Sequence, residues 1–113
     1  MKNKVKLKLD GVVKMSQKTF IKEETKLKIK KPPMYKVLIH NDDYTTMEFV
    51  VEVLINIFKR QVVEATKIMY DVHKIGVGVA GVYSYDIAAT KIVQGMTMAE
   101  SSGFPLKFSM EEE

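Results

Sequence analysis

The stretch His40-Asn41-Asp42-Asp43-Tyr44-Thr45-Thr46-Met47-Glu48-Phe49 joins two strongly patterned segments of the chain. An apolar run, 35–39, precedes it, and a run with helical periodicity, 47–60, follows it. Asn and Asp favour turns because their side chains hydrogen-bond to nearby backbone. Thr45, followed three residues later by Glu48, matches a capping box and predicts the start of a helix. The junction therefore concentrates acceptor oxygens where a strand ends and a helix begins, which is a good place to hold a small cationic group.

The composition is that of one ordinary globular domain: 113 residues, 46% apolar and 28% charged. The chain contains no cysteine, which excludes disulfides and is compatible with a reducing cytosol, so we expect a cytoplasmic protein. No apolar run approaches the roughly 18 residues needed to span a membrane, and the N-terminus lacks the apolar segment of a secretory signal. With only His40 and His73, we expect neither a metal site nor a cofactor.

Charge divides the chain at Pro32-Pro33. Residues 1–31 contain 11 lysines and 3 acidic residues, whereas residues 32–113 carry a net charge of −4. Two consecutive prolines disfavour both a helix and a sheet ladder. We therefore predict a flexible basic N-terminal extension over 1–31 and a folded domain over 32–113. The extension lacks arginine, and its alternating Lys-apolar runs contain no aromatic residue, so we do not expect nucleic acid as a partner.

The rest of the chain predicts the order β-α-α-β-α-β. Apolar patterns indicate strands at 34–39, 77–83 and 106–110, and helices at 47–59, 62–75 and 85–101. Gly76 and Gly103 are typical helix ends, and Ser84 is a typical cap for the third helix. The inward faces of the second and third helices are predicted to include Ile75 and Met96, and residues 111–113 to form a solvated tail. The fold class is α+β, a compact domain with a small three-stranded antiparallel sheet packed on helices.

Several of these segments together resemble the ClpS family, the adaptors of the bacterial Clp protease. The matching segments are Asn41-Asp42-Asp43-Tyr44-Thr45, Met47-Glu48-Phe49-Val50, and residues 31–37, 65–73, 81–83, 90–91 and 105–106. The resemblance extends over about 31–110. It implies an adaptor that is not an enzyme. Such an adaptor binds N-degron substrates, whose free N-terminus begins with Leu, Phe, Tyr or Trp, and delivers them to the AAA+ unfoldase ClpA, which feeds the ClpP peptidase.

The resemblance also assigns roles to residues. It implies that the substrate α-amino group is held by Asn41, Asp42 and His73. It implies that the side-chain pocket is formed or bordered by Asp43, Thr45, Met47, Val50, Met69, Val72 and Leu106. Met47 stands where the family has a gatekeeper that excludes β-branched side chains. Contact with the N-domain of the unfoldase is implied for Asp86, Thr90 and Lys91. The expected partners are a ClpA-type unfoldase and N-degron substrates, and the expected state is a monomer.

The residue types agree with this chemistry, because an ammonium group has three donors, and an amide oxygen, a carboxylate and a neutral imidazole supply acceptors. Taken singly, these residues are as typical of a loop, a packed core or a solvated surface. Two other classes stay open. One is a nucleic-acid or ribosome-associated domain acting through the Lys-rich arm. The other, least favoured, is a small hydrolase using His73 with Asp42 or Asp43, which lacks a Ser or Cys nucleophile beside a base.

Overall fold

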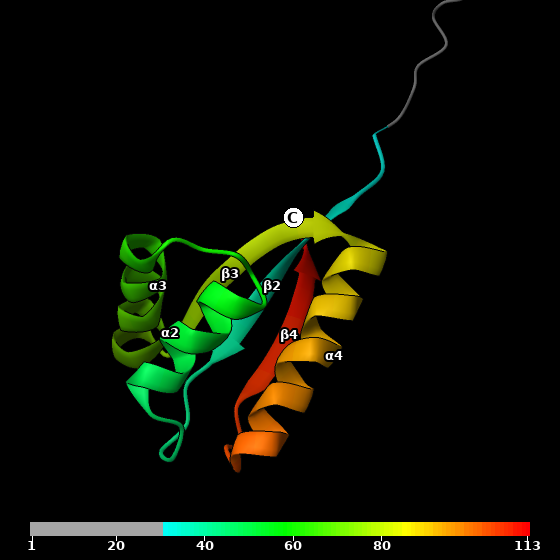
Figure 1. Ribbon diagram of the computed structural model, residues 1–113. Helices are drawn as coiled ribbons and strands as arrows, with labels where there is room; N and C mark the ends of the chain where they lie inside the picture. Colours follow the sequence, from blue (N-terminus) through cyan, green and yellow to red (C-terminus); the bar gives the residue numbers. More distant parts are fainter. Residues whose placement is uncertain (1–30) are drawn as a thin grey trace, which may run out of the picture. The chain divides into compact units, whose positions relative to one another are not determined.

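The computed structural model describes residues 31–113, and the structural statements below concern that part of the chain. Six elements follow one another as β-α-α-β-α-β, which confirms the predicted α+β class (Figure 1). They are β2 (Met34–His40), α2 (Met47–Asn56), α3 (Val62–Ile75), β3 (Val77–Ser84), α4 (Tyr85–Ser102) and β4 (Lys107–Glu112). The predicted extension lies, apart from Lys31, outside the described residues, so the division of the chain at Pro32 stays a prediction.

The three strands form one antiparallel sheet in the order β3-β2-β4, as predicted. Its central strand, β2, buries Val37 and Ile39 completely, in accordance with the period of two. Both side chains belong to a core shared with the helices. Helix α4 contacts all three strands, α3 contacts β3, and α2 packs on α3. The central strand thus ends at His40 and leads directly into the turn of the candidate site.

Strand β4 extends further than the sequence predicts. Glu111 pairs with Lys36 in the sheet, and Lys36 Nζ lies 3.6 Å from a Glu111 carboxylate oxygen. The backbone N–H of Glu113 donates to the carbonyl of Met34 at 2.8 Å. The predicted solvated tail is therefore wrong for the backbone of these glutamates, although their side chains are exposed. Pairing with β2 satisfies backbone groups that a tail would leave to water.

Helix α2 ends at Asn56, three residues before its predicted end. Lys59 has a φ of 57°, in the left-handed region, which stops the helical hydrogen-bond pattern. The backbone N–H of Arg60 donates back to the carbonyl of Leu54 at 3.0 Å. This bond spans one residue more than the corresponding bond of a Schellman motif, but it likewise satisfies a free carbonyl at a helix C-terminus next to a left-handed residue. The chain therefore turns sharply here, and α3 returns along α2.

Helix α4 approaches the sheet closely at Gly95. A Cβ atom on Gly95 would lie 2.7 Å from the ring of Phe108, so a larger residue here would require the ring to shift. Met96, predicted to face inward, is exposed because it lies about 100° around the helix from Gly95. Ile75, also predicted inward, is exposed at the last residue of α3. Ser84 is the N-cap residue of α4 as predicted, without a side-chain capping bond.

Candidate functional site

The turn between β2 and α2 is organised by the carboxylate of Asp42. Its Oδ1 atom accepts hydrogen bonds from the backbone N–H groups of Tyr44 at 2.8 Å and Thr45 at 2.7 Å. Its Oδ2 atom accepts from the Thr45 hydroxyl at 2.7 Å. Burial raises the pKa of the Asp42 carboxyl, but these three hydrogen bonds outweigh it and hold the pKa below its ordinary value. Asp42 is therefore a carboxylate at neutral pH, with most of its acceptor capacity used inside the turn.

The helix after the turn is capped by Thr46 rather than Thr45. The Thr46 hydroxyl accepts from the backbone N–H of Phe49 at 3.1 Å, and Thr46 has the extended backbone of an N-cap residue. The predicted Thr45–Glu48 capping box is wrong, because the Thr45 hydroxyl is already engaged by Asp42. Glu48 nevertheless lies in the first turn of α2, where the helix dipole favours negative charge.

The turn is attached to the C-terminal end of α3. The backbone N–H of Asn41 donates to the carbonyl of Gly76 at 3.0 Å. Gly76 ends α3, as predicted, with a φ of 103° that favours glycine, and its own N–H donates to the carbonyl of Val72. This bond places the side chain of Asn41 next to the last turn of α3, which carries His73.

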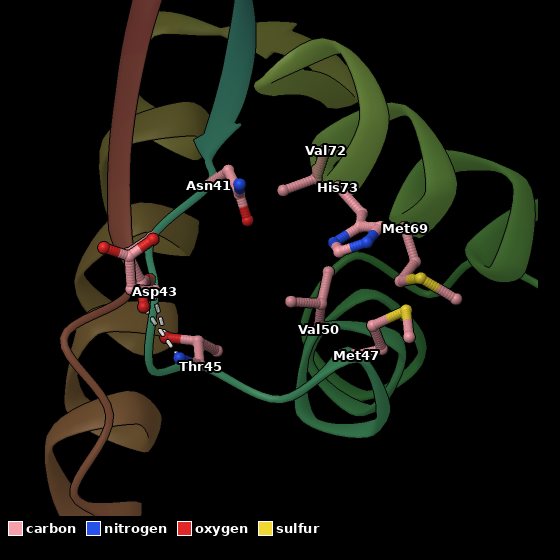
Figure 2. Close-up of a pocket in the computed structure, with 9 residues that line it drawn as sticks. Asn41, Asp43, Thr45, Met47, Val50, Met69, Val72 and His73 are labelled. Atoms are coloured by element: carbon pink, nitrogen blue, oxygen red, sulfur yellow. Dashed lines mark hydrogen bonds between the residues drawn. The ribbon is translucent and has the colours of Figure 1, made fainter.

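The turn, the start of α2 and the C-terminal half of α3 surround an open pocket of about 260 Å³ (Figure 2). The pocket is lined by Asn41, Asp42, Asp43, Thr45, Met47, Val50, Met69, Val72 and His73. These are all but one of the residues that the sequence assigns to the α-amino and side-chain subsites. The exception is Leu106, which is only 5% exposed and belongs to the hydrophobic core instead of the pocket lining.

The pocket has a polar side and an apolar side. Figure 2 shows Asn41 and Thr45 on the side of the turn, with Val50, Met69 and His73 across from them on the helices. Val50 and Met69 are buried, whereas the imidazole of His73 is exposed. Oxygen and nitrogen acceptors thus lie beside an apolar surface, an arrangement that suits a ligand with a cationic group next to a hydrophobic group.

The candidate acceptor groups differ in the number of lone pairs that remain for hydrogen bonds to a ligand. A carboxylate offers about four lone-pair sites, and the turn occupies three of those on Asp42. Within residues 31–113, the side chains of Asn41, Asp43 and His73 make no hydrogen bond that meets ordinary distance and angle criteria. With respect to residues 31–113, Asn41, Asp43 and His73 therefore keep their bonding capacity for a ligand, and Asp42 keeps one lone pair.

The three residues expected to contact an unfoldase lie in the first two turns of α4, and none of them lines the pocket. Asp86 and Thr90 are exposed, and the Thr90 hydroxyl donates to the Asp86 carbonyl at 3.0 Å. Lys91 is half-buried. Its Nζ atom donates to the carbonyl of Ile57 at 2.8 Å and lies 5.4 Å from the ring centre of Tyr83. Its ammonium group thus helps to hold α4 against the end of α2.

No three His, Cys, Asp or Glu side chains within residues 31–113 gather closely enough to hold a metal ion. Among the helices of the same range, none is long and apolar enough to cross a membrane.

Sequence reasoning missed two determinants of the pocket. The first is the carbonyl of Gly76, which positions Asn41 through a backbone bond that no side-chain pattern reveals. The second is that the carboxylate of Asp42 accepts hydrogen bonds from its own turn. Its signal was present, because an Asp followed by Thr three residues later is the pattern of a side chain that closes its own turn.

The described residues form a small α+β domain with an open, partly apolar pocket, an arrangement that suits the binding of a ligand. Residues 30–109 match the family model described as ATP-dependent Clp protease adaptor protein ClpS. The chain therefore belongs to the ClpS family; it is an adaptor of the Clp protease, it works with a Clp unfoldase and its substrates, and it is not an enzyme.

Individual relatives agree over nearly their whole length. The chain is 58% identical over 100 residues to the ClpS adaptor of Clostridium acetobutylicum, covering 87% of this chain and 99% of the relative. It is 56% identical over 99 residues to that of Acetivibrio thermocellus, covering 88% of this chain and 100% of the relative. Among solved structures, Agrobacterium tumefaciens ClpS2 bound to L-phenylalaninamide is similar with a TM-score of 0.70 and 38% identity. That similarity covers 74% of this chain and 100% of the other.

Proposed function

We propose that this adaptor binds the free N-terminus of proteins whose first residue is Leu, Phe, Tyr or Trp, and delivers these N-degron substrates to ClpA. The observation that carries the proposal is that acceptors and buried apolar side chains share one pocket of about 260 Å³. The bound molecule in the similar Agrobacterium structure supports it. Phenylalaninamide has a free α-amino group, a benzyl side chain and an amide in place of the next peptide bond.

The α-amino group is the specific part of this ligand. A free N-terminus has a pKa of about 7.7–8.0, so it is largely an ammonium group with three donors at neutral pH. The side-chain oxygen of Asn41, a ring nitrogen of His73 and the remaining lone pair of Asp42 are the proposed acceptors. The C-terminal end of α3 adds the partial negative charge of its dipole, which favours a cation at the same place.

The first side chain of the substrate enters the apolar part of the pocket. A cavity of about 150 Å³ is enough for benzene, so a pocket of about 260 Å³ holds one aromatic or isobutyl group beside an ammonium group. Val50, Met69 and Val72 form the walls, and a flexible methionine adapts to several side-chain shapes. Met47 is 42% exposed at the rim, where we propose that it acts as the gatekeeper against β-branched residues.

Delivery requires a second surface, which we place on the first two turns of α4. Asp86 and Thr90 present exposed polar groups to the unfoldase N-domain. Lys91 joins this contact through the exposed part of its side chain, because its ammonium group is bonded to Ile57. The same proposal describes a monomeric adaptor in the cytoplasm, as expected from the absence of cysteine and from the family.

Two assays test binding and delivery separately. Fluorescence anisotropy with peptides that differ only in their first residue should show binding for Leu, Phe, Tyr and Trp, and none for Ala or Ile. Degradation by purified ClpA and ClpP of a reporter beginning with Phe should accelerate when the adaptor is added. An Asp86→Lys variant that binds peptide normally should lose this acceleration. Equal binding of all first residues would refute the pocket, and equal degradation with Asp86→Lys would refute the docking surface.

The nucleic-acid alternative rests on residues 1–31, which lie outside the described residues apart from Lys31. No feature of residues 31–113 favours binding of nucleic acid.

A further inference from the structure

A second hollow adjoins the pocket on the outer faces of α2 and α3. It has a volume of about 370 Å³ and is lined by Met47, Glu48, Val51, Met69 and Tyr70. Met47 and Met69 line the first pocket as well, so these two side chains form the wall between the two spaces. Figure 2 shows both methionines on the side of the pocket away from Asn41. The second hollow thus continues the pocket beyond its apolar end.

The lining of this hollow is mostly apolar although it is open to water. Tyr70 is 46% exposed and Met47 is 42% exposed, and Val51 is a further apolar residue of the lining. Glu48 is the charged residue of the lining. Lys74 Nζ lies 5.4 Å from the centre of the Tyr70 ring. Covering the apolar atoms by an apolar ligand is favourable because it removes them from water.

We propose that the hollow is a subsite for an apolar side chain at the second position of the substrate. The inference rests on the proposed function, since it takes the first residue to occupy the pocket. Consecutive Cα atoms are about 3.8 Å apart, and side chains of an extended chain point alternately to opposite sides. One layer of methionine between two side chains makes a contact of about 3.5–4.0 Å on each side, so it needs about 7–8 Å between them, a separation that the ends of two long side chains pointing to opposite sides can reach. The second side chain then lies on the far side of the Met47–Met69 wall.

The test compares two peptides, Phe-Ala and Phe-Leu at their first two positions and identical thereafter, by fluorescence anisotropy with the full chain. Phe-Leu should bind roughly three- to tenfold more tightly, as expected for partial burial of a leucine side chain. In Tyr70→Ala this ratio should fall close to one. Val51→Thr, which replaces a methyl by a hydroxyl group in the hollow, should reduce it as well. Val63→Ala is the control on the same helix; Val63 is exposed outside both hollows, and the ratio should not change.

Each other outcome is decisive. Equal affinities of Phe-Ala and Phe-Leu in the unsubstituted protein would overturn the subsite and leave the proposed function standing. A ratio that survives both Tyr70→Ala and Val51→Thr would place the second side chain elsewhere and overturn the subsite. Failure of both peptides to bind would overturn the proposed function and the subsite together. Self-association of the free protein that Tyr70→Ala abolishes would assign the hollow to a second copy of the chain and also overturn the subsite.

Discussion

The backbone N–H of Asn41 donates to the carbonyl of Gly76 across 3.0 Å, which attaches the strand-to-helix turn to the C-terminal end of α3. The bond holds the amide of Asn41 within the same pocket as the imidazole of His73, although the two residues are 32 positions apart in the chain. A single backbone contact between two elements therefore aligns the proposed acceptors before any ligand arrives, and the ligand does not have to order them.

Gly76→Ala should weaken both the fold and the pocket. A Cβ atom at Gly76 would meet nothing within 4 Å, so the cost arises from its φ of 103°, about 1–2 kcal/mol in the free energy of unfolding. Peptide affinity should fall as well, because a shifted Gly76 carbonyl displaces Asn41. The matched control is Gly103→Ala, which has a φ of 78° and equal space at the end of α4. It should show a similar loss of stability in urea with unchanged peptide affinity; equal affinity losses would contradict the role of Gly76.

Asp42→Asn should destabilise the protein at neutral pH, and the difference should shrink in acid. The folded-state pKa of Asp42 is lowered, so its charge contributes stability above the unfolded-state value of about 3.9. That contribution is lost as pH falls through the folded-state pKa. Asparagine keeps an acceptor for the backbone N–H groups of Tyr44 and Thr45 but lacks the charge. Urea unfolding of both proteins at pH 7 and below pH 3 measures the effect, and a pH-independent difference would show that the charge is irrelevant.

His73→Ala should weaken binding of a Phe-peptide by about 1–3 kcal/mol, as for other hydrogen bonds to charged groups. The reason is that the His73 ring offers a nitrogen acceptor to the ammonium group of the peptide. His40→Ala is the control, since His40 bonds to Ser109 at 2.7 Å away from the pocket lining. Unchanged affinity with His73→Ala, or an equal loss with His40→Ala, would contradict the assignment.

Met47→Ala should broaden the set of accepted first residues to Ile and Val. The shortened side chain opens the rim of the pocket, where β-branched groups need extra width near the backbone. Met96→Ala serves as the control, because Met96 is also exposed and lies on α4 outside the pocket lining. Affinities of Ile- and Val-peptides measured with the two variants should rise only for Met47→Ala. Unchanged selectivity would remove the gatekeeper role.

Much of the fold follows from local patterns, whereas the pocket residues follow from the resemblance to the ClpS family. The predicted ends of α3 agree with the observed ends. At its C-terminus, Gly76 adopts the left-handed conformation that ends the helix. The lining residues belong to two short segments, 41–50 and 69–73, and the helical repeat places Met69 and His73 on one face. Within each of these two segments, residues that are close in sequence are therefore also close in space.

The incorrect predictions concern positions whose structure is determined by a tertiary contact or by competition between neighbouring residues. Thr45 and Thr46 are equivalent as caps by residue type, and only the bond from Thr45 to Asp42 leaves the role to Thr46. Leu106, just before β4, belongs to the core, and its place at the border of the pocket stays a prediction. Met96 is exposed because the close approach of Gly95 to Phe108 determines which face of α4 packs on the sheet.

The central claim is that the pocket recognises a free α-amino group next to a bulky side chain. The most direct measurement is an anisotropy titration of two Phe-peptides that are identical except that one is acetylated at its N-terminus. Acetylation keeps the benzyl group and removes the cation and two of its donors. The free peptide should bind saturably, and the acetylated peptide should not bind. Equal affinity for both would contradict it.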